Sequence, residues 1–358
     1  MIIENVTRRD LLALPLATLL HAAPTAQIIS VQPQYYHGWP TLARRRSGEL
    51  LAVYSGGREA HICPYGRVEM IRSQDDGVTW SFPEVLMDSA IDDRDAGICE
   101  TAAGTLLVST FTSLAYETTK DRNPAWDSVN RRMNAERRKV LVGMWLLRST
   151  DSGSTWSAPA RVPVNSPHGP VALADGRVLY PGKDLWGGGK IGVAESKDDG
   201  VSWRMLADIP TRPGDRFEEY HELHGVEVGG GRMLVHIRNQ NVSNNRETLQ
   251  SESNDGGRSW SVPRPIGVWG MPSHLLRLRS GRLLMTYGYR RAPFGNRARW
   301  SDDGGKSWSE ERVISDDGVG GDLGYPSTVE LAGGELLTLW YERLASSPRA
   351  VLRIARWK

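Results

Sequence analysis

The sequence is poor in several features that would assign it to particular protein classes. It has only two cysteines in 358 residues, too few to staple the fold with disulfides or to build a multi-cysteine zinc module. Its 44 basic and 42 acidic side chains nearly cancel, to a formal charge of +2, so no nucleic-acid partner is expected. Beyond the N-terminus no segment is apolar enough to span a membrane. What remains is a chain long enough to bury a large core.

Two residue types occur in unusual proportions. Tryptophan outnumbers phenylalanine by 13 to 4, although hydrophobicity alone would not select indole, so particular positions must require it. Only seven of the 44 basic residues are lysine, which leaves 37 arginines. Codon bias accounts for much of such an excess, but arginine is also the residue that binds a carboxylate through two parallel hydrogen bonds.

Residues 1–26 are predicted to be a targeting segment. Positions 7–12 read Thr-Arg-Arg-Asp-Leu-Leu and open a short apolar run, which is followed by the small residues of 22–26. This order resembles a twin-arginine export signal, and a buried N-terminal helix is the alternative. The mature protein is then expected to be exported, to the periplasm or the outside. In such a compartment Cys63 and Cys99 could pair, and two free thiols fit the sequence equally well.

One octapeptide pattern occurs five times and describes a hairpin turn. It reads Ser-x-Asp-x-Gly-x-[Ser/Thr]-Trp, in which Asp can cap backbone N–H groups, Gly takes a positive φ, and Trp packs under the next strand. The copies are Ser73–Trp80, Ser149–Trp156, Ser196–Trp203, Ser253–Trp260 and Ser301–Trp308. They resemble the Asp-boxes of sialidase-like β-propellers. Calcium binding is the weaker alternative, because each copy supplies too few oxygen ligands.

The Asp-boxes predict an all-β, six-bladed propeller over residues 27–358. Six Leu- and Val-rich strands, each directly after a glycine, alternate with the boxes. They are Glu49–Tyr54, Thr105–Thr110, Arg177–Tyr180, Arg232–Ile237, Arg282–Tyr287 and Glu335–Tyr341. The chain ends in a third strand, Val351–Trp357, so Ile28–Val31 is predicted to supply the outer strand and close the ring. A charged, helix-compatible insertion at about 112–139 in blade two is either a roof over the pocket or a solvated helix.

The resemblance to sialidases implies a site on the face opposite the boxes. In that family a tyrosine nucleophile, paired with a glutamate, attacks the anomeric carbon, an aspartate serves as acid/base, and three arginines hold the sugar carboxylate. Glu222 and Tyr325 match the glutamate and the tyrosine in local sequence, and Arg238 matches a clamp arginine. The other arginines that resemble clamp residues are Arg58 in blade one and Arg290 and Arg297 in blade five.

Two positions depart from the sialidase pattern. The first clamp arginine is replaced by Gly38, in the sequence His-Gly-Trp-Pro at 37–40, and Arg67 or Arg94 could take its place. In blade one His61 stands where the acid/base aspartate is expected, and the ordinary pKa of histidine suits proton transfer near neutrality. Asp95, in a dense cluster of charged residues, is the rival acid/base.

Further residues are predicted to bind the sugar. His168, His224 and His274 fall in the loops that lead into their blades and are expected to bind hydroxyl groups, although three converging histidines could also hold a metal ion. Trp39 is expected to stack on a sugar face, and packing within the fold is the alternative. No metal or cofactor is expected to be required.

Three functions are compatible with such a site. The favoured one is an exported exo-glycosidase that hydrolyses a terminal, acidic sugar from a glycan, with Tyr325 and Glu222 at the anomeric carbon and His61 or Asp95 delivering the proton. The second is a polysaccharide lyase that acts on uronic acids with a His/Tyr pair, and the pocket histidines and the absent arginine favour it. The third is a glycan-binding propeller without catalysis.

Overall fold

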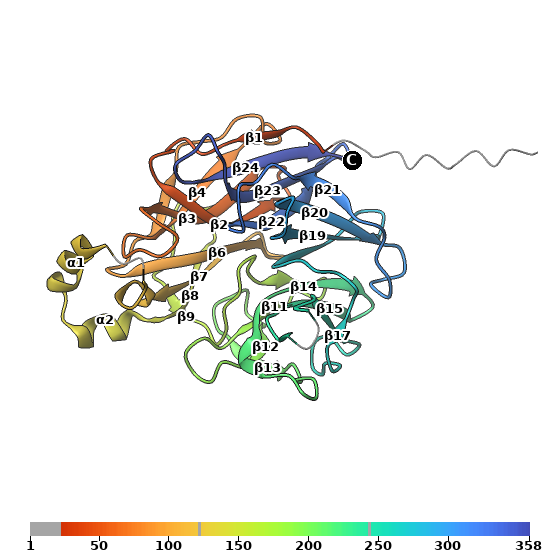
Figure 1. Cartoon of the computed structure of the whole chain (residues 1–358). Helices are drawn as coiled ribbons and strands as arrows, with labels where there is room; N and C mark the ends of the chain where they lie inside the picture. The colour runs from red at the N-terminus through yellow and green to blue at the C-terminus, as the bar shows by residue number, and fades with distance from the viewer. Residues whose placement is uncertain (1–22, 121–122, 243–244) are drawn as a thin grey trace, which may run out of the picture.

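The computed structural model describes residues 23–120, 123–242 and 245–358, so the predicted export signal lies almost wholly outside the described residues. Within that part of the chain, 24 strands form six four-stranded antiparallel sheets. Neighbouring sheets contact one another through their first strands and close into a ring (Figure 1). The prediction of an all-β, six-bladed propeller is therefore confirmed.

Each sheet is one blade, and its strands follow one another from the axis outward. Blades one to three contain β2 (Tyr36–Arg44), β3 (Leu50–Arg58), β4 (Arg67–Ser73) and β5 (Glu84–Met87); β6 (Asp92–Glu100), β7 (Leu106–Ser113), β8 (Gly143–Ser149) and β9 (Ala160–Arg161); and β10 (Val171–Ala172), β11 (Val178–Lys183), β12 (Ile191–Ser196) and β13 (Arg204–Asp208). Blades four and five contain β14 (Tyr220–Gly229), β15 (Arg232–Asn239), β16 (Leu249–Ser253) and β17 (Arg264–Pro265); and β18 (Ser273–Arg277), β19 (Leu283–Tyr289), β20 (Gly295–Ser301) and β21 (Arg312–Ser315).

Blade six joins the two ends of the described chain. It contains β22 (Leu323–Glu330), β23 (Leu336–Arg343) and β24 (Ala350–Trp357), with β1 (Ala26–Ile28) as the outer strand. The outer strand was expected at 28–31 and ends earlier, because beyond Ile28 the regular ladder gives way to irregular contacts: Ile29 N donates to Leu352 O, and Leu352 N donates to the Ser30 hydroxyl. The pairing of β1 with β24 closes the ring and leaves β24 without a free edge.

The hydrophobic core lies between the faces of adjacent blades. Side chains alternate along β3, so Leu50 and Ala52 pack against blade six while Leu51 and Val53 pack against blade two. Each interior strand is therefore apolar on both faces, which explains the continuous Leu- and Val-rich runs that the sequence shows at these positions.

The Asp-boxes occupy the turns between the third and fourth strands of blades one to five. In the first box the Asp75 carboxylate accepts from Thr79 N at 2.9 Å and from the Thr79 hydroxyl at 2.6 Å, and Gly77 has φ +87°. Trp80 Nε1 donates to Gly77 O at 3.2 Å. The carboxylate is thus occupied by the turn itself, as a structural box requires.

The insertion in blade two lies between β7 and β8. It contains two 3₁₀ turns, Ala115–Glu117 and Pro124–Trp126, and two short helices, α1 (Asp127–Arg132) and α2 (Ala135–Leu141). Trp126 is buried and donates to Glu59 of blade one at 2.9 Å, whereas neither α1 nor α2 buries a residue. The 3₁₀ turns therefore dock on the neighbouring blade, and the two helices are solvated.

Cys63 and Cys99 are both free thiols. Among the described residues, no helix has the length and apolarity that crossing a bilayer demands.

Candidate functional site

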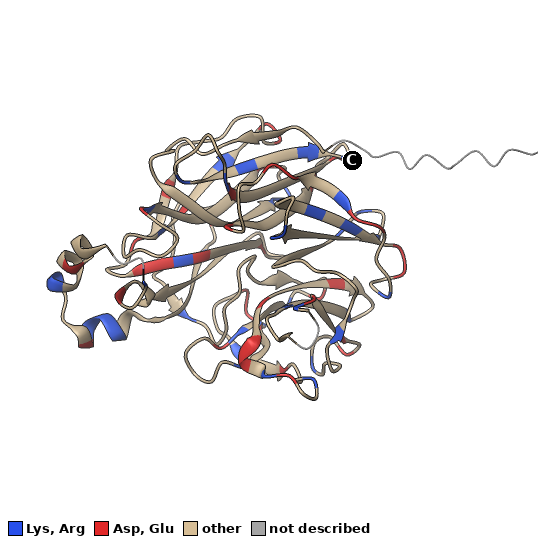
Figure 2. Ribbon diagram, viewed as in Figure 1, with Lys and Arg blue, Asp and Glu red and all other residues tan. Residues whose placement is uncertain are grey.

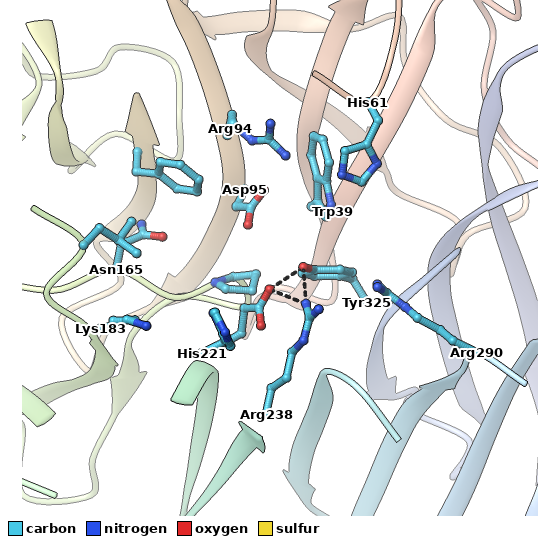
Figure 3. Close-up of a pocket in the computed structure, with 14 residues that line it drawn as sticks. Trp39, His61, Arg94, Asp95, Asn165, Lys183, His221, Arg238, Arg290 and Tyr325 are labelled. Carbon is cyan, nitrogen blue, oxygen red and sulfur yellow. Dashed lines mark hydrogen bonds and ion pairs between the residues drawn. The ribbon is translucent and has the colours of Figure 1, made fainter. Parts of the chain in front are cut away.

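A cavity of about 350 Å³ lies near the axis, on the face opposite the Asp-boxes. First strands begin and second strands end on that face, so their termini converge there from all six blades. The lining residues are Trp39, His61, Arg94, Asp95, Phe111, Asn165, Pro167, Lys183, Leu185, His221, Glu222, Arg238, Arg290 and Tyr325 (Figure 3). The volume is at the small end of the usual range for ligand pockets, which suits one sugar ring.

Irregularities in the first strands aim the functional side chains into this cavity. The ladders of β2, β6 and β22 shift register near Trp39, Asp95 and Tyr325, and these residues adopt φ of +51°, +45° and +51°. β14 shifts in the same way around Glu222. Such bulges redirect side chains, and a positive φ on a non-glycine residue costs roughly 1–3 kcal/mol. The same strained geometry in three blades makes the start of the first strands a candidate functional site.

Glu222, Tyr325 and Arg238 form one hydrogen-bonded group in the cavity (Figure 3). The Tyr325 hydroxyl donates to Glu222 Oε1 at 2.6 Å, and Arg238 Nη1 donates to the same oxygen at 2.7 Å. Burial opposes ionisation of Glu222, but the Arg238 charge and the Tyr325 hydroxyl together lower its pKa to about 2. Burial and the Glu222 carboxylate raise the pKa of Tyr325 well above its usual value. At neutral pH a neutral phenol therefore faces an ionised carboxylate that can take its proton.

Asp95 and Arg94 enter the cavity from blade two, where the start of β6 is banded red and blue in Figure 2. Burial raises the pKa of Asp95 to about 7, with Arg94 opposing the shift and Glu222 adding to it. The Arg94 guanidinium lies 4.4 Å from the centroid of the Trp39 ring. Asp95 is thus poised to gain or lose a proton near neutral pH.

His61 reaches the cavity from the loop between β3 and β4. Its Nδ1 lies 2.9 Å from Asp322 Oδ1, an oxygen that also accepts from the Tyr36 hydroxyl at 2.9 Å and from the Tyr341 hydroxyl at 3.2 Å. Burial lowers the pKa of His61, and the hydrogen bond to Asp322 counteracts that effect. Asp322 was not predicted as a site residue, because its role depends on a partner 261 positions away in the sequence.

The cavity carries more positive than negative charge. Four lining residues are basic, namely Arg94, Lys183, Arg238 and Arg290, and two are acidic. Arg290 donates through Nε to Leu323 O at 3.1 Å, while its buried Nη2 has no hydrogen-bond partner in the described part of the chain. An unpaired guanidinium nitrogen in a positively charged pocket is suited to an anionic ligand.

A tyrosine ring lies next to Gly38, the residue at the position of the first clamp arginine of the sialidase pattern. A Cβ atom at this position would lie 3.0 Å from Cε1 of Tyr36. The Tyr36 ring therefore occupies the adjacent space. Its hydroxyl donates to Asp322 Oδ1 and lies 3.0 Å from His61 Nδ1.

Three arginines predicted to bind substrate do not line the cavity. Arg58 is fully buried and holds Asp92 with two hydrogen bonds, so it supports the wall of the pocket. Arg67 pairs with Glu69 at 2.6 Å and lines a separate cavity beside α1. Arg297 is buried and donates to backbone carbonyls, including Pro293 O at 3.0 Å. Each of these side chains is held by a structural partner.

The predicted histidines His168, His224 and His274 come together, but outside the cavity that holds Tyr325 and Glu222. They are buried on the axis and line a second cavity of about 450 Å³. The rings of His224 and His274 are stacked at 4.4 Å, and His168 lies edge-on to both. No set of three or more His, Cys, Asp or Glu side chains in the described ranges has a geometry that could hold a metal ion.

Sequence reasoning missed several lining residues. They are Phe111, Asn165, Pro167, Lys183, Leu185 and His221. Lys183 and His221 are in the segments that lead to the site-bearing face, so their position in the propeller repeat could have identified them. Lys183 Nζ donates to Glu218 O and Tyr220 O, both at 2.7 Å, and so links blades three and four.

Comparisons with known proteins agree with this architecture. Residues 126–337 match the family described as the BNR repeat-like domain. A sialidase from Bacteroides fragilis is 26% identical over 243 residues, which cover 62% of this chain and 42% of that relative. This chain therefore matches less than half the length of the curated relative.

Solved structures share the fold at low identity. A protein of unknown function from Dyadobacter fermentans has a TM-score of 0.74 and 22% identity, with 93% of this chain and 98% of that chain covered. The NanB sialidase from Streptococcus pneumoniae has a TM-score of 0.69 and 13% identity, with 93% and 70% covered. An intramolecular trans-sialidase from Ruminococcus gnavus has a TM-score of 0.65 and 14% identity, with 94% and 97% covered.

Proposed function

Because the chain belongs to the family of BNR repeat-like domains, we propose that it is a glycoside hydrolase of the sialidase type, which removes a terminal acidic sugar from a glycan. The observation that carries this proposal is the hydrogen-bonded pair of Tyr325 and Glu222, 2.6 Å apart, in a cavity with an excess of positive charge. The curated sialidase relative supports the reaction class.

Tyr325 is the nucleophile in this mechanism. A neutral phenol can approach a sugar that carries a carboxylate next to the anomeric carbon, whereas an anionic nucleophile would be repelled. As the Tyr325 oxygen bonds to the anomeric carbon, its proton passes to Glu222. Glu222 is a weak base while Arg238 donates a charged hydrogen bond to it. A substrate carboxylate beside Arg238 shares that positive charge, which raises the proton affinity of Glu222 at the moment of reaction.

The arginines bind the acidic group. Arg290 offers its unpartnered Nη2, and Arg94 lies across the cavity beside Trp39 (Figure 3). The proton for the leaving group comes from His61 or Asp95, which both line the cavity. In the second half-reaction the same residue accepts a proton from water, which then releases the sugar from Tyr325.

Turnover assays test this proposal. The purified protein is incubated with sialosides and with glycans that end in a glucuronic acid, and the products are identified by mass. We expect wild-type protein to release an intact acidic sugar, and both Tyr325→Phe and Glu222→Gln to lose at least a hundredfold in kcat. Full activity of both variants would refute the assignment. An unsaturated uronide with its ultraviolet absorbance would instead establish a lyase, and specific glycan binding without turnover would indicate a lectin.

The exported location remains a prediction of the sequence. It is consistent with a glycan substrate outside the cytoplasm.

A further inference from the structure

Two cavities meet at the site, and they share two residues. The cavity that holds Tyr325 and Glu222, called the catalytic cavity below, is next to an open groove of about 410 Å³ between blades one and six. His61 and Arg290 line both spaces, while Ile62, Thr119 and Gly321 line the groove alone. His61 therefore lies at the boundary between the cavity and the groove, and its side chain is 45% exposed.

The positions of the catalytic cavity and the groove indicate where the two parts of a glycoside, the attacked sugar and the leaving group, would bind. The nucleophile, Tyr325, lines the catalytic cavity, also called the inner cavity, and does not line the groove. The sugar that is attacked therefore lies in the inner cavity. The guanidinium of Arg290 lies 5.6 Å from the centroid of the Tyr325 ring, which places the mouth of the groove next to the nucleophile. The bond that breaks thus runs from the inner cavity towards the groove, and its oxygen lies at the boundary.

The orientation of His61 is fixed by its neighbours. Its Nδ1 faces Asp322 Oδ1 at 2.9 Å, and the ring lies edge-on to Trp39 at 4.9 Å between centroids. When Nδ1–H donates to the carboxylate, Nε2 is the nitrogen left to exchange a proton with a substrate. Figure 3 shows the His61 ring beside Trp39, on the same side of the cavity as Arg94.

Resting on the proposed function, we propose that His61, held by Asp322 as a positioning residue, protonates the leaving group, and that the groove is a binding site for the next sugar of the glycan. Asp95 lines only the inner cavity and is 6% exposed. It contacts the bound acidic sugar, not the departing oxygen. The groove walls are small or neutral at Ala60, Ile62, Thr119 and Gly321, which suits an uncharged sugar ring.

The proton and electron movements balance. His61 Nε2–H gives its proton to the glycosidic oxygen, and the electrons of the breaking C–O bond go to that oxygen. Tyr325 bonds to the anomeric carbon and its proton goes to Glu222. Water then replaces the leaving group in the groove, loses a proton to His61 Nε2 and attacks the anomeric carbon. The electrons of the carbon–tyrosine bond return to Tyr325, which regains its proton from Glu222.

Asp322 stabilises the protonated form of His61, which burial and nearby positive charges disfavour. Burial, Arg94 of blade two and Arg58 of blade one all lower the pKa of His61, and Asp322 is the anion that counteracts them. Tyr36, from the start of β2, donates to the same Asp322 oxygen. Loss of the carboxylate should therefore weaken proton donation without removing the imidazole.

The test compares a good and a poor leaving group on the same sugar. The probes are 4-nitrophenyl sialoside and sialyllactose, with 4-nitrophenyl glucuronide and a glucuronic-acid-capped oligosaccharide as the second pair. Because nitrophenolate departs without protonation, His61→Asn should lose at least a hundredfold in kcat/KM on the oligosaccharide and less than tenfold on the nitrophenyl glycoside. Asp322→Asn should show the same selectivity to a smaller degree, and Asp322→Glu should partly restore the oligosaccharide rate.

Asp95→Asn is the matched control, and it should affect both leaving groups equally. Gly321→Leu tests the groove separately, because a Cβ atom there meets nothing closer than Arg290 Cβ at 3.9 Å. It should raise KM for the oligosaccharide at least tenfold and leave inhibition by the free acidic sugar unchanged, since that sugar needs only the inner cavity.

The outcomes separate this inference from the proposed function. If His61→Asn loses kcat/KM equally on both substrates, or if Asp95→Asn loses it selectively on the oligosaccharide, the inference is overturned. An inactive Tyr325→Phe would still support the hydrolase in that case. An unchanged oligosaccharide KM in Gly321→Leu would overturn the groove assignment. If wild-type protein cleaves neither pair, or if Tyr325→Phe keeps full activity on both, the proposed function itself fails and the inference falls with it.

Discussion

The replacement of His37 by phenylalanine should make the protein less sensitive to acid. His37 is in β2, is 1% exposed, and packs edge-on against Tyr54 with ring centroids 5.2 Å apart. Neither of its ring nitrogens has a hydrogen-bond partner among the described residues. Phenylalanine preserves the shape and the aromatic contact and removes the two unsatisfied polar atoms, so the fold should tolerate it.

The size of the effect follows from the pKa of this histidine. Burial, with a smaller contribution from Arg67, lowers the pKa of His37 from 6.5 to about 4. Because the native pKa is below the unfolded one, stability is present in full above the unfolded pKa and is lost as the pH falls towards 4. At pH 5 the unfolded state is almost fully protonated and the native state is mostly neutral, which costs about 2 kcal/mol relative to pH 8.

Urea unfolding at pH 8 and at pH 5 measures this difference. The wild-type free energy of unfolding should fall between the two pH values by about 2 kcal/mol more than that of His37→Phe, with unchanged m-values. The other buried histidines contribute equally to both proteins and cancel in the comparison. An identical loss of stability in the two proteins would refute the idea that His37 is buried in its neutral form.

Three further predictions concern the site and its frame. Arg290→Met should raise KM for an acidic glycoside roughly 10- to 150-fold in steady-state assays, because a charged hydrogen bond contributes about 1.5–3 kcal/mol; an unchanged KM would exclude Arg290 as a substrate ligand. Asp95→Asn should abolish the rise in KM that an anionic substrate shows as wild-type Asp95 ionises above pH 7, near its pKa of about 7; a profile of KM against pH identical to wild type would contradict this. Gly97→Ala should lower the free energy of unfolding by about 1–3 kcal/mol, because its Cβ would lie 2.2 Å from Gly169 N in the backbone of the next blade; wild-type stability in urea would show that the two blades are not so closely packed.

The fold could be predicted because its signals are local. An Asp-box is a self-contained turn, as in the first copy, where Asp75 bonds to Ser73 and Thr79, both within four positions of it. Five boxes and the six Gly-preceded strands that alternate with them therefore give six blades without any knowledge of long-range contacts. Strand limits were less predictable, and the outer strand of blade six was misplaced, since its limits depend on contacts between Ser30 and Leu352 at the opposite end of the chain.

The candidate site could be predicted only where a local motif defines a residue. Glu222, Tyr325 and Arg238 were found through their sequence neighbourhood, and the structure brings them into one group. Arg58 and Arg297 look equally suitable in sequence, but both are buried against partners of their own.

Long-range pairing also decides the rest of the site. Asp322 gains its role from His61, which belongs to another blade, and no pattern in either segment indicates the pair. His168, predicted to bind substrate, lies outside this site, and its backbone has φ +73°, a conformation that sequence does not predict for a residue other than glycine.

Covalent trapping tests the central claim most directly. Wild-type protein is incubated with a fluorinated, activated analogue of the acidic sugar that it cleaves, digested, and analysed by peptide mass spectrometry. The account predicts one sugar adduct, on the Tyr325 oxygen, that is absent in Tyr325→Phe and that forms more slowly in Glu222→Gln. An adduct on another residue, or undiminished labelling of Tyr325→Phe, would contradict it.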